Sequence, residues 1–204
     1  DFVAVAYNGE ECPAETIYLN DYISGYQVED NKLYKETKRG EHGRVSDWGT
    51  HFDLNNALEL DTDLAYLFGR WLGDGCVTHR TKSDIPSGIK IVFSLEERAE
   101  AEEIAGIIER KFGLVPSLKM SSTGRWLDVW ANSMPLGQFF KAFLGAYSYG
   151  KRIPDVLMHM PREQTIALLR GLFSADGYTS KNQLGIVLSN RTMATQVHQL
   201  LLRL

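Results

Sequence analysis

A nine-residue pattern occurs twice in this chain and constrains its fold more than any other feature. Residues 67–75 read Leu-Phe-Gly-Arg-Trp-Leu-Gly-Asp-Gly, and residues 169–177 read Leu-Arg-Gly-Leu-Phe-Ser-Ala-Asp-Gly. Small residues recur at every fourth position in and before both copies, namely Ala65, Gly69, Gly73 and Ala167, Gly171, Ala175. Residues four apart share one face of a helix. The pattern therefore predicts two helices whose backbones pack closely and whose ends bring Asp74 and Asp176 together.

The paired aspartates indicate a shared divalent cation. An acidic residue in the last turn of a helix faces the negative end of the helix dipole, which costs about 0.3–1 kcal/mol where the residue is exposed. A cation between two such carboxylates reverses the sign of this interaction, and hard oxygen ligands suit Mg²⁺. A plainer interpretation is a helix-to-strand turn, with Gly75 and Gly177 in the left-handed C-cap conformation. Duplication together with the small-residue stripe favours the metal site.

The two copies resemble the motif that gives the LAGLIDADG (DOD-type) homing endonucleases their name. Both retain its Leu, its first Gly, its second Asp and its final Gly, while Arg70-Trp71-Leu72 and Ser174 depart from it. In the family the last Asp is the metal ligand, so these departures leave the assignment unchanged. The resemblance implies that Asp74 and Asp176 are catalytic and bind Mg²⁺ with the backbone carbonyls of Gly73 and Ala175.

The segments after each motif predict the same order of elements, as expected of an internal repeat. Residues 76–80 and 88–93 predict a hairpin with a long polar loop, and a helix follows from a capping box at Ser94 and Glu97 to Gly113. A second hairpin (116–120 and 125–130) and an apolar helix from residue 133 to 143 complete the first round. After the second motif, a shorter hairpin precedes a helix that opens near Asn190 and carries the apolar residues Met193, Val197, Leu200, Leu201 and Leu204.

This order indicates an α+β fold. The resemblance implies the LAGLIDADG fold of the two-motif single-chain type, in which pseudo-twofold αββαββα repeats meet at two packed motif helices, here with an incomplete second repeat. We expect an acidic, strand- and turn-rich extension over residues 1–60, the first repeat over 61–160, capped by Asp61, and the start of the second over 161–204. The extension suits a protein-splicing (intein) segment, a host-protein remnant, an accessory domain or a DNA-contacting arm. Position 1 offers no splicing nucleophile.

Lys151 begins the stretch Lys-Arg-Ile-Pro before the second motif. The resemblance implies that Lys151 is the catalytic basic residue near the scissile phosphate. A role in positioning phosphate, or a solvated side chain, remains an alternative because lysine is a common phosphate contact.

The charge of the chain is divided along its length. Residues 1–63 contain 5 basic and 14 acidic residues, net −9, whereas residues 64–204 contain 17 and 12, net +5. The acids of the second part concentrate on residues 96–103, which we expect to lie away from the hairpins. Hairpins fit the DNA major groove. The candidate contacts to double-stranded DNA are His79, Arg80, Lys82, Lys90, Lys119, Arg125, Lys181 and Arg191, although any one of them is more often simply solvated.

No apolar run reaches transmembrane length, and the isolated Cys12 and Cys76 fit no metal or redox spacing, so we expect an intracellular protein without a membrane partner. The expected function is site-specific double-strand DNA cleavage with Mg²⁺, as in intron or intein homing, by a monomer acting as a pseudo-dimer. The alternative is a catalytically silent protein on the same fold, such as an intron RNA maturase or a DNA-binding regulator. Unrelated packing helices of another α/β enzyme are a third, weaker interpretation.

Overall fold

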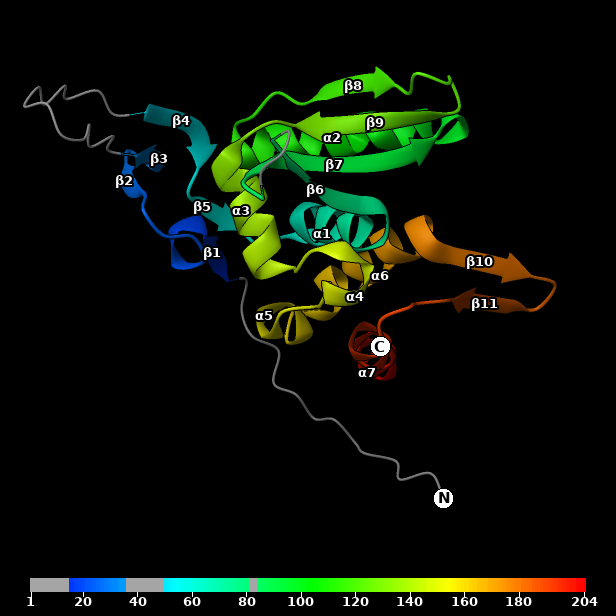
Figure 1. Cartoon of the computed structure of the whole chain (residues 1–204). Helices are drawn as coiled ribbons and strands as arrows, with labels where there is room; N and C mark the ends of the chain where they lie inside the picture. The colour runs from blue at the N-terminus through cyan, green and yellow to red at the C-terminus, as the bar shows by residue number, and fades with distance from the viewer. Residues whose placement is uncertain (1–14, 36–49, 81–83) are drawn as a thin grey trace, which may run out of the picture.

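Two central helices organise the computed structural model, which describes residues 15–35, 50–80 and 84–204 (Figure 1). They are α1 (Thr62–Asp74) and α6 (Arg162–Asp176), the two motif helices, and they pack side by side. An antiparallel sheet of four strands lies on the α1 side, and a two-stranded hairpin extends from the end of α6 (Figure 1). The fold is therefore α+β, as the sequence predicts.

Small residues bring the two helix backbones into contact. A Cβ atom added at Gly69 would lie 1.9 Å from the carbonyl oxygen of Leu168, and one at Gly171 would lie 2.3 Å from that of Tyr66. A Cβ atom at Gly73 would lie 2.2 Å from the Cβ of Ala175. These separations are shorter than van der Waals contact, so the interface excludes larger side chains at these positions. The close packing predicted from the stripe is confirmed.

The first repeat contains the two predicted hairpins and both predicted helices. Strands β6 (Gly75–His79), β7 (Pro86–Ser94), β8 (Ser117–Met120) and β9 (Trp126–Ala131) form a sheet in the order β6-β7-β9-β8. After the 3-10 turn η2 (Leu95–Glu97), α2 (Arg98–Phe112) packs on this sheet, and α3 (Met134–Phe143) covers α1. β7 begins at Pro86, so the loop before it is shorter than predicted.

Local signals for helix ends are confirmed in three places. Asp61 caps α1 by accepting a hydrogen bond from the Leu64 backbone N–H, and the Ser94–Glu97 capping box precedes α2. Gly113 ends α2 with φ at 75°, in the left-handed region that glycine adopts without strain. These caps depend on neighbours in sequence, which explains why they could be read without tertiary structure.

The plainer interpretation placed Gly75 and Gly177 in the left-handed conformation, and this detail of it is wrong. Both residues are extended, with φ of −84° and −77°, because each one directly begins a strand. Glycine is required there for a different reason. An added Cβ would lie 2.3 Å from the Trp71 ring at the first site and 2.3 Å from the Phe173 carbonyl oxygen at the second.

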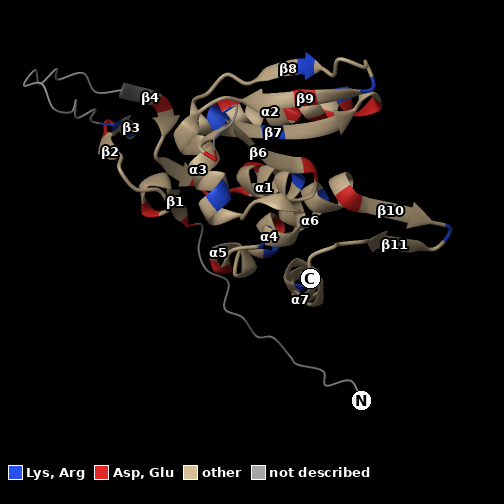
Figure 2. Cartoon of the chain, in the orientation of Figure 1, with Lys and Arg blue, Asp and Glu red and all other residues tan. Residues whose placement is uncertain are grey.

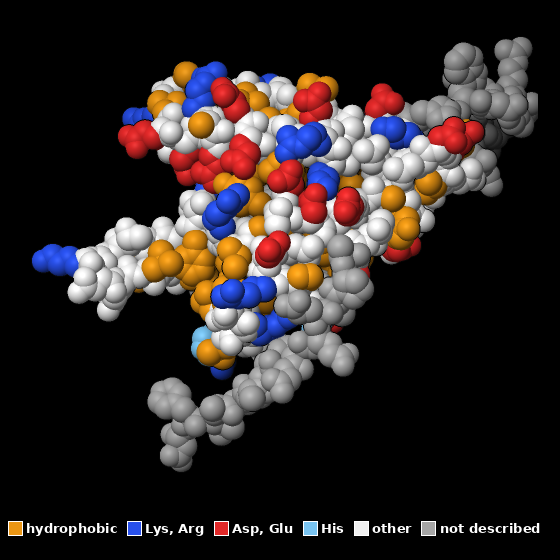
Figure 3. Space-filling model, turned by 180° about the vertical axis from the view of Figure 1, so that it is seen from behind, with side chains coloured by type: hydrophobic (Ala, Val, Ile, Leu, Met, Phe, Trp, Pro, Cys, Tyr) orange, Lys and Arg blue, Asp and Glu red, His pale blue; other side chains and the backbone are white. Residues whose placement is uncertain are grey.

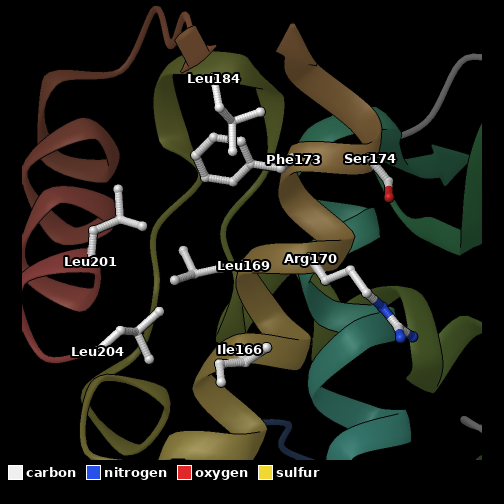
Figure 4. A pocket seen from close by; sticks show the side chains of 8 residues that line it. All are labelled: Ile166, Leu169, Arg170, Phe173, Ser174, Leu184, Leu201 and Leu204. Carbon is white, nitrogen blue, oxygen red and sulfur yellow. The ribbon is translucent and has the colours of Figure 1, made fainter. Parts of the chain in front are cut away.

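The second repeat leaves part of α6 uncovered within the described residues. The hairpin of β10 (Gly177–Ser180) and β11 (Gln183–Ile186) leads to α7 (Arg191–Leu202), which Asn190 caps. Met193, Val197 and Leu200 are buried as their spacing suggests, but Leu201 and Leu204 are 45% and 41% exposed. Figure 4 shows the reason, since both line an open apolar hollow whose lining is Ile166, Leu169, Arg170, Phe173, Ser174, Leu184, Leu201 and Leu204.

The comparable face of α1 is closed by α3. The rings of Phe139, Phe140 and Phe143 surround Phe68 with centroids 5.4–6.5 Å away, and Phe140 also contacts Trp71. Residues 84–204 provide no counterpart of β8, β9 and α3 after α7. Among the described residues, α3 therefore closes this face of α1, whereas residues of α6 line the hollow.

The described part of the N-terminal extension packs on the first repeat. Its elements are β1 (Thr16–Tyr18), η1 (Leu19–Asp21), β2 (Gln27–Glu29), β3 (Lys32–Lys35), β4 (Thr50–Asn55) and β5 (Ala57–Glu59), which form two small antiparallel sheets. Leu19, Leu33 and Leu54 are fully buried in the same hydrophobic core as α1. The Tyr22 ring contacts Phe143 of α3 at 4.9 Å between centroids. This packing attaches the extension to the face of α3 distant from the hairpin tips (Figure 1).

The remaining described segments join α3 to α6. They contain the short helices α4 (Tyr147–Gly150) and α5 (Asp155–Met158), and Pro154 precedes α5 as the sequence indicates. None of the helices in the described part of the chain combines the length and apolar character needed to cross a bilayer.

Candidate active site

Asp74 and Asp176 lie together at the adjoining ends of α1 and α6. A Cβ atom added at Gly73 would lie 3.4 Å from Oδ2 of Asp176, which places the second carboxylate against the last turn of the first helix. Asp74 is half-buried and Asp176 is exposed. The small-residue interface is the cause of this proximity, because bulky residues would hold the helix ends apart.

The surroundings of Asp74 disfavour its ionised form. The pKa of Asp74 is raised from 3.8 to about 6, chiefly by burial and also by the nearby carboxylates of Asp176 and Glu97, while Arg70 and Lys151 oppose the shift. Burial raises a carboxyl pKa because the charged form loses hydration. A cation bound beside Asp74 would therefore relieve an electrostatic cost that the fold imposes.

Lys151 reaches this site from the loop between α4 and α5. Its Nζ donates hydrogen bonds to the carbonyl oxygens of Gly73 at 2.8 Å and Trp71 at 3.1 Å, and the residue is only 7% exposed. The pKa of Lys151 is lowered from 10.5 to about 8 because the effect of burial exceeds the opposing effect of Asp176 and Asp74. The ammonium group thus lies at the negative end of the α1 dipole, where it donates to the Gly73 carbonyl and shares the Trp71 carbonyl with the Gly75 backbone N–H.

α7 holds the Lys151 loop in place. The Asn190 side chain donates hydrogen bonds to the backbone carbonyls of Tyr149 and Lys151, at 2.9 and 2.6 Å. Gln196 bonds both the N–H and the carbonyl of Ile153. Elements of the second repeat therefore position Lys151, whose ammonium group donates hydrogen bonds to the last turn of the first motif helix.

The oxygen atoms at this end could hold a divalent cation that takes its remaining ligands from outside the protein. The described residues contain no cluster of three or more His, Cys, Asp or Glu side chains able to enclose a metal. Mg²⁺ commonly binds through one or two carboxylates together with water and substrate phosphates. Asp74, Asp176 and the Gly73 carbonyl provide such a set, and the ammonium of Lys151 already lies on that carbonyl as a cation. Ala175 faces Gly73 across the helix interface.

Arg70 is a part of the site that the sequence interpretation treated only as a departure from the motif. Its side chain is fully buried in α1, and its guanidinium lies 4.5 Å from the Phe93 ring centroid. One Nη donates to Glu97 at 2.9 Å, the other lies 3.7 Å from Asp74, and Nε lies 3.7 Å from Glu100. In the sequence, the signal for this buried role of Arg70 is that it is a single charged residue within an otherwise apolar helical pattern.

The acids of residues 96–103 are divided between two environments. Glu97 and Glu100 turn toward Arg70 of α1. The side chains of Glu102 and Glu103 are exposed. Figure 3, a view from behind, shows acidic side chains gathered in the upper part of that face, where α2 runs.

We expect Arg70→Met to lower the free energy of unfolding by about 2 kcal/mol. Removing one partner of a fully buried ion pair costs about 3–5 kcal/mol, and the acids around Arg70 are 20–35% exposed, which reduces the loss. Arg98→Met is the matched control, because Arg98 pairs with Glu102 on the surface of α2 and such pairs contribute less than about 1 kcal/mol. Urea denaturation measures both, and equal losses in the two variants would contradict the role given to Arg70.

The basic residues predicted to contact DNA lie mainly on the hairpins (Figure 2). Lys90 lies in β7 and Lys119 in β8, whereas Arg125 and Lys181 lie at the turns of the β8–β9 and β10–β11 hairpins. His79 ends β6 and the exposed Arg80 follows it outside the strand. Arg191 begins α7 and is exposed. Lys82 lies outside the described residues.

Comparisons with known proteins agree with the fold described above. The family model described as a LAGLIDADG-like domain matches residues 163–204. A structure of I-DmoI in complex with DNA and Mn is similar with a TM-score of 0.55 and 18% sequence identity, over 72% of this chain and 79% of that one. A structure of mesophilic variants of the homing endonuclease I-DmoI is similar with a TM-score of 0.53 and 18% identity, over 70% of this chain and 76% of that one.

Two larger enzymes contain segments similar to this chain. A DNA polymerase of Thermococcus sp. (strain GE8) is 33% identical over 116 residues, which are 52% of this chain and 6% of the polymerase. The ribonucleoside-diphosphate reductase NrdEB subunit alpha of Bacillus subtilis (strain 168) is 22% identical over 174 residues, which are 82% of this chain and 14% of that subunit. The chain thus spans a small part of the length of these relatives.

The resemblance inferred from the two motifs is confirmed at the level of the fold. The chain has the LAGLIDADG fold seen in I-DmoI, and its second motif lies in a LAGLIDADG-like domain. The fold places both motif helices, but it does not by itself assign chemistry to their aspartates.

Proposed function

We propose that this protein is a site-specific DNA endonuclease that cuts both strands by Mg²⁺-dependent phosphodiester hydrolysis. The main observation that supports this proposal is the convergence of Asp74, Asp176 and Lys151 at the adjoining ends of two packed helices. Support also comes from similarity in fold to I-DmoI, for which structures with DNA together with Mn or Ca are described. Because Lys151 lies beside the two carboxylates, the site contains both ligands for a cation and a positively charged group suited to phosphate.

Each residue of the site has a distinct role in this proposal. Asp74 and Asp176, with the carbonyls of Gly73 and Ala175, would hold the divalent cations at the helix ends. A bound divalent cation supplies Lewis-acid polarisation of the scissile phosphate and lowers the pKa of an attacking water. Lys151 contributes a buried positive charge beside them, which stabilises the negative charge that develops on the phosphate. The low exposure of Lys151 strengthens this interaction because little water screens it.

Double-stranded DNA is the proposed partner of the hairpin surface. The two pairs of basic residues Lys90 with Lys119 and Arg125 with Lys181 lie on β-ribbon elements that match the width of the major groove. A single chain with two motif helices would address the two strands as a pseudo-dimer, without a second copy. Phosphate contacts from the remaining basic residues would add salt-dependent, sequence-independent affinity.

We also propose an origin in a mobile element of an intein or intron, acting inside the cell. A segment similar to this chain lies within both a polymerase and a reductase subunit, two enzymes with different names. An inserted endonuclease carried by unrelated host proteins accounts for that distribution. The extension over residues 15–60 packs on the first repeat and would then be a splicing or accessory segment.

Cleavage and binding of a randomised duplex DNA library test the proposal. Selective cutting in Mg²⁺, with binding but no cutting in Ca²⁺, is the expected result. Selective binding in both ions without any cutting would instead favour a silent regulator on the same fold. Preferential binding of structured RNA would favour an RNA maturase. Both alternatives are less well supported at present, because the two carboxylates and Lys151 are all in place.

Lys151→Met is expected to slow cleavage about 10²-fold while DNA affinity in Ca²⁺ changes less than about threefold. Removing a preorganised positive group from a site of developing charge costs about 10²–10³ in rate. The control is Arg152→Met, since Arg152 is exposed and its guanidinium donates only to the Ala142 carbonyl among described partners. Single-turnover cleavage rates at saturating enzyme decide the matter, and equal rates for the two variants would leave Lys151 without a catalytic role.

A further inference from the structure

The loop that carries Lys151 has a strained backbone. Tyr147, the first residue of α4, has φ at 59°, in the left-handed region that a bulky residue rarely adopts. Gly145 has φ at 88°, and a Cβ atom added there would lie 2.0 Å from the carbonyl oxygen of Gly150. Strained conformations of this kind persist only where the surrounding structure holds them. Residues 145–151, the lysine loop, therefore depend on contacts from elsewhere in the fold.

The lysine loop itself provides little of that support. The Lys151 backbone N–H donates to the Tyr147 carbonyl at 3.2 Å, and the Arg152 N–H donates to the Leu144 carbonyl at 2.9 Å. These bonds close the loop but do not attach it to another element. The side chains of Tyr147 and Tyr149 are 74% and 79% exposed, so they add little packing. A single helical turn is unstable alone, because nucleation fixes several dihedral angles for one hydrogen bond.

Asn190 attaches the lysine loop to the beginning of α7. Its side-chain nitrogen donates to the carbonyl oxygens of Tyr149 at 2.9 Å and Lys151 at 2.6 Å. Its side-chain oxygen accepts from the Met193 backbone N–H at 3.1 Å and thereby caps α7. Asn190 is 7% exposed, so these bonds lie in a region of low dielectric constant, where they are stronger than in water. One side chain thus caps a helix and holds the loop at two points.

The residue type at position 190 suits this double task. Serine, threonine, aspartate and asparagine all cap helices well, because each has a side-chain oxygen that accepts from the backbone. Among these four, only asparagine also has an amide nitrogen with two donors. Capping α7 alone therefore allows four residue types, whereas capping it while donating to two loop carbonyls selects asparagine.

We propose that Asn190 is a positioning residue for DNA cleavage, which holds the strained lysine loop so that the ammonium group of Lys151 stays at the end of α1. This inference rests on the proposed function. The ammonium group donates to the Gly73 carbonyl at 2.8 Å, in the last turn that also carries Asp74. Asn190 acts through Lys151 and does not itself contact the reacting atoms. Misplacing a catalytic group by about 1 Å can cost about 10²-fold in rate, so a relaxed loop would slow the reaction.

α7 has a second attachment that makes this role separable from its docking. Gln196 bonds both the N–H and the carbonyl of Ile153, two residues beyond Lys151. These bonds, together with the buried Met193 and Val197, keep α7 in place when the donors of Asn190 are removed. A change at Asn190 should therefore loosen the lysine loop without detaching the helix.

Amine labelling measures the placement of Lys151 without any need for cleavage. Lys151 is 7% exposed, so it should react with an acetylating succinimidyl ester at least about tenfold more slowly than the exposed Lys181, because reaction requires local opening. Asn190→Ser and Asn190→Asp retain a capping oxygen for α7 but lose the amide donors. Both should raise the labelling of Lys151 relative to Lys181 by about tenfold, measured by peptide mass spectrometry.

Val197→Ala is the control for a general loss of stability. Val197 is 2% exposed on α7, and its truncation weakens packing without removing a hydrogen bond to the lysine loop. Labelling of Lys151 in this variant should stay within about twofold of the wild type, although thermal unfolding will show that the protein is less stable. Equal labelling in Val197→Ala and the Asn190 variants would overturn the positioning role, because loosening would then follow from any weakening of α7.

A double-mutant cycle connects the same hydrogen bonds to cleavage. Asn190→Ser should slow single-turnover cleavage by about tenfold or more, while DNA affinity in Ca²⁺ changes less than about threefold. In a Lys151→Met protein, the same substitution should change the rate by less than about threefold, since the charge that Asn190 positions is already absent. Fully additive losses would show that Asn190 does not act through Lys151, and they would overturn the inference.

These outcomes separate the inference from the proposed function. A wild-type protein that cuts, combined with unchanged labelling of Lys151 in both Asn190 variants, overturns the positioning role alone. A wild-type protein that cuts no DNA overturns the proposed function and with it the kinetic role of Asn190. In that case the labelling rates still decide whether Asn190 holds Lys151 at the end of α1.

Discussion

Asp74→Asn is expected to lower the rate of DNA cleavage by at least about 10³-fold while leaving affinity for target DNA in Ca²⁺ within a few-fold. The amide has the size of the carboxylate but lacks its charge, so the divalent cation is lost while the helix interface is kept. Several kcal/mol of transition-state stabilisation depend on such a cation, and each 1.36 kcal/mol corresponds to a factor of ten. Single-turnover cleavage and gel-shift titration provide the two readouts, and Asp176→Asn should behave alike.

Thermal unfolding gives this prediction a readout independent of activity. Mn²⁺ or Ca²⁺ should raise the melting temperature of the wild type and of Asp84→Asn, a control at an exposed loop residue, but not that of Asp74→Asn. Retention of cutting by both Asp74→Asn and Asp176→Asn would show that the metal assignment is wrong.

In the absence of metal, the raised pKa of Asp74 predicts whether the Asp74→Asn variant is more or less stable than the wild type. Burial raises this pKa to about 6 from 3.8, so the folded protein retains a proton that the unfolded chain loses between these values. Stability from this group therefore falls as pH rises through that window. Metal-free Asp74→Asn should be more stable than wild type at pH 8, and the difference should vanish below about pH 3.8.

Gly69→Ala is expected to destabilise the fold by about 3 kcal/mol, although alanine usually stabilises a helix relative to glycine by about 1 kcal/mol. The added methyl group would lie 1.9 Å from the Leu168 carbonyl oxygen, a backbone atom that cannot move without displacing α6. Overpacking of this kind costs about 1–3 kcal/mol, occasionally more. Because α1 and α6 must separate, cleavage should also fall as Asp74 and Asp176 move apart.

Gly106→Ala provides the matched control for this substitution. Gly106 also lies inside a helix, α2, but its added Cβ would approach only the flexible end of the Arg110 side chain, at 3.1 Å. We expect this variant to be as stable as the wild type or up to about 1 kcal/mol more stable. Urea denaturation compares the pair. A Gly69→Ala protein as stable as Gly106→Ala would contradict the close backbone contact.

The local elements and one long-range contact could be predicted from the amino-acid sequence alone. Periodicity and caps located α1, α2, α6 and α7, because these signals depend on residues within one or two turns. The Ala and Gly stripe was able to predict the α1–α6 contact because small residues at every fourth position leave few other arrangements for two helices. The hairpins were recognisable, but the order β6-β7-β9-β8 was not.

The set of distant side chains that meet at the site became apparent from the three-dimensional structure and could not be predicted. The burial of Arg70 between Asp74, Glu97 and Glu100, and the reach of Lys151 to the Gly73 carbonyl, join segments separated by tens of residues. Lys90 and Asp128 became neighbours through strand register, which a shift of one residue would have reversed. Local patterns carry no information about such register or packing, because these depend on the free energy of the whole fold rather than on adjacent residues.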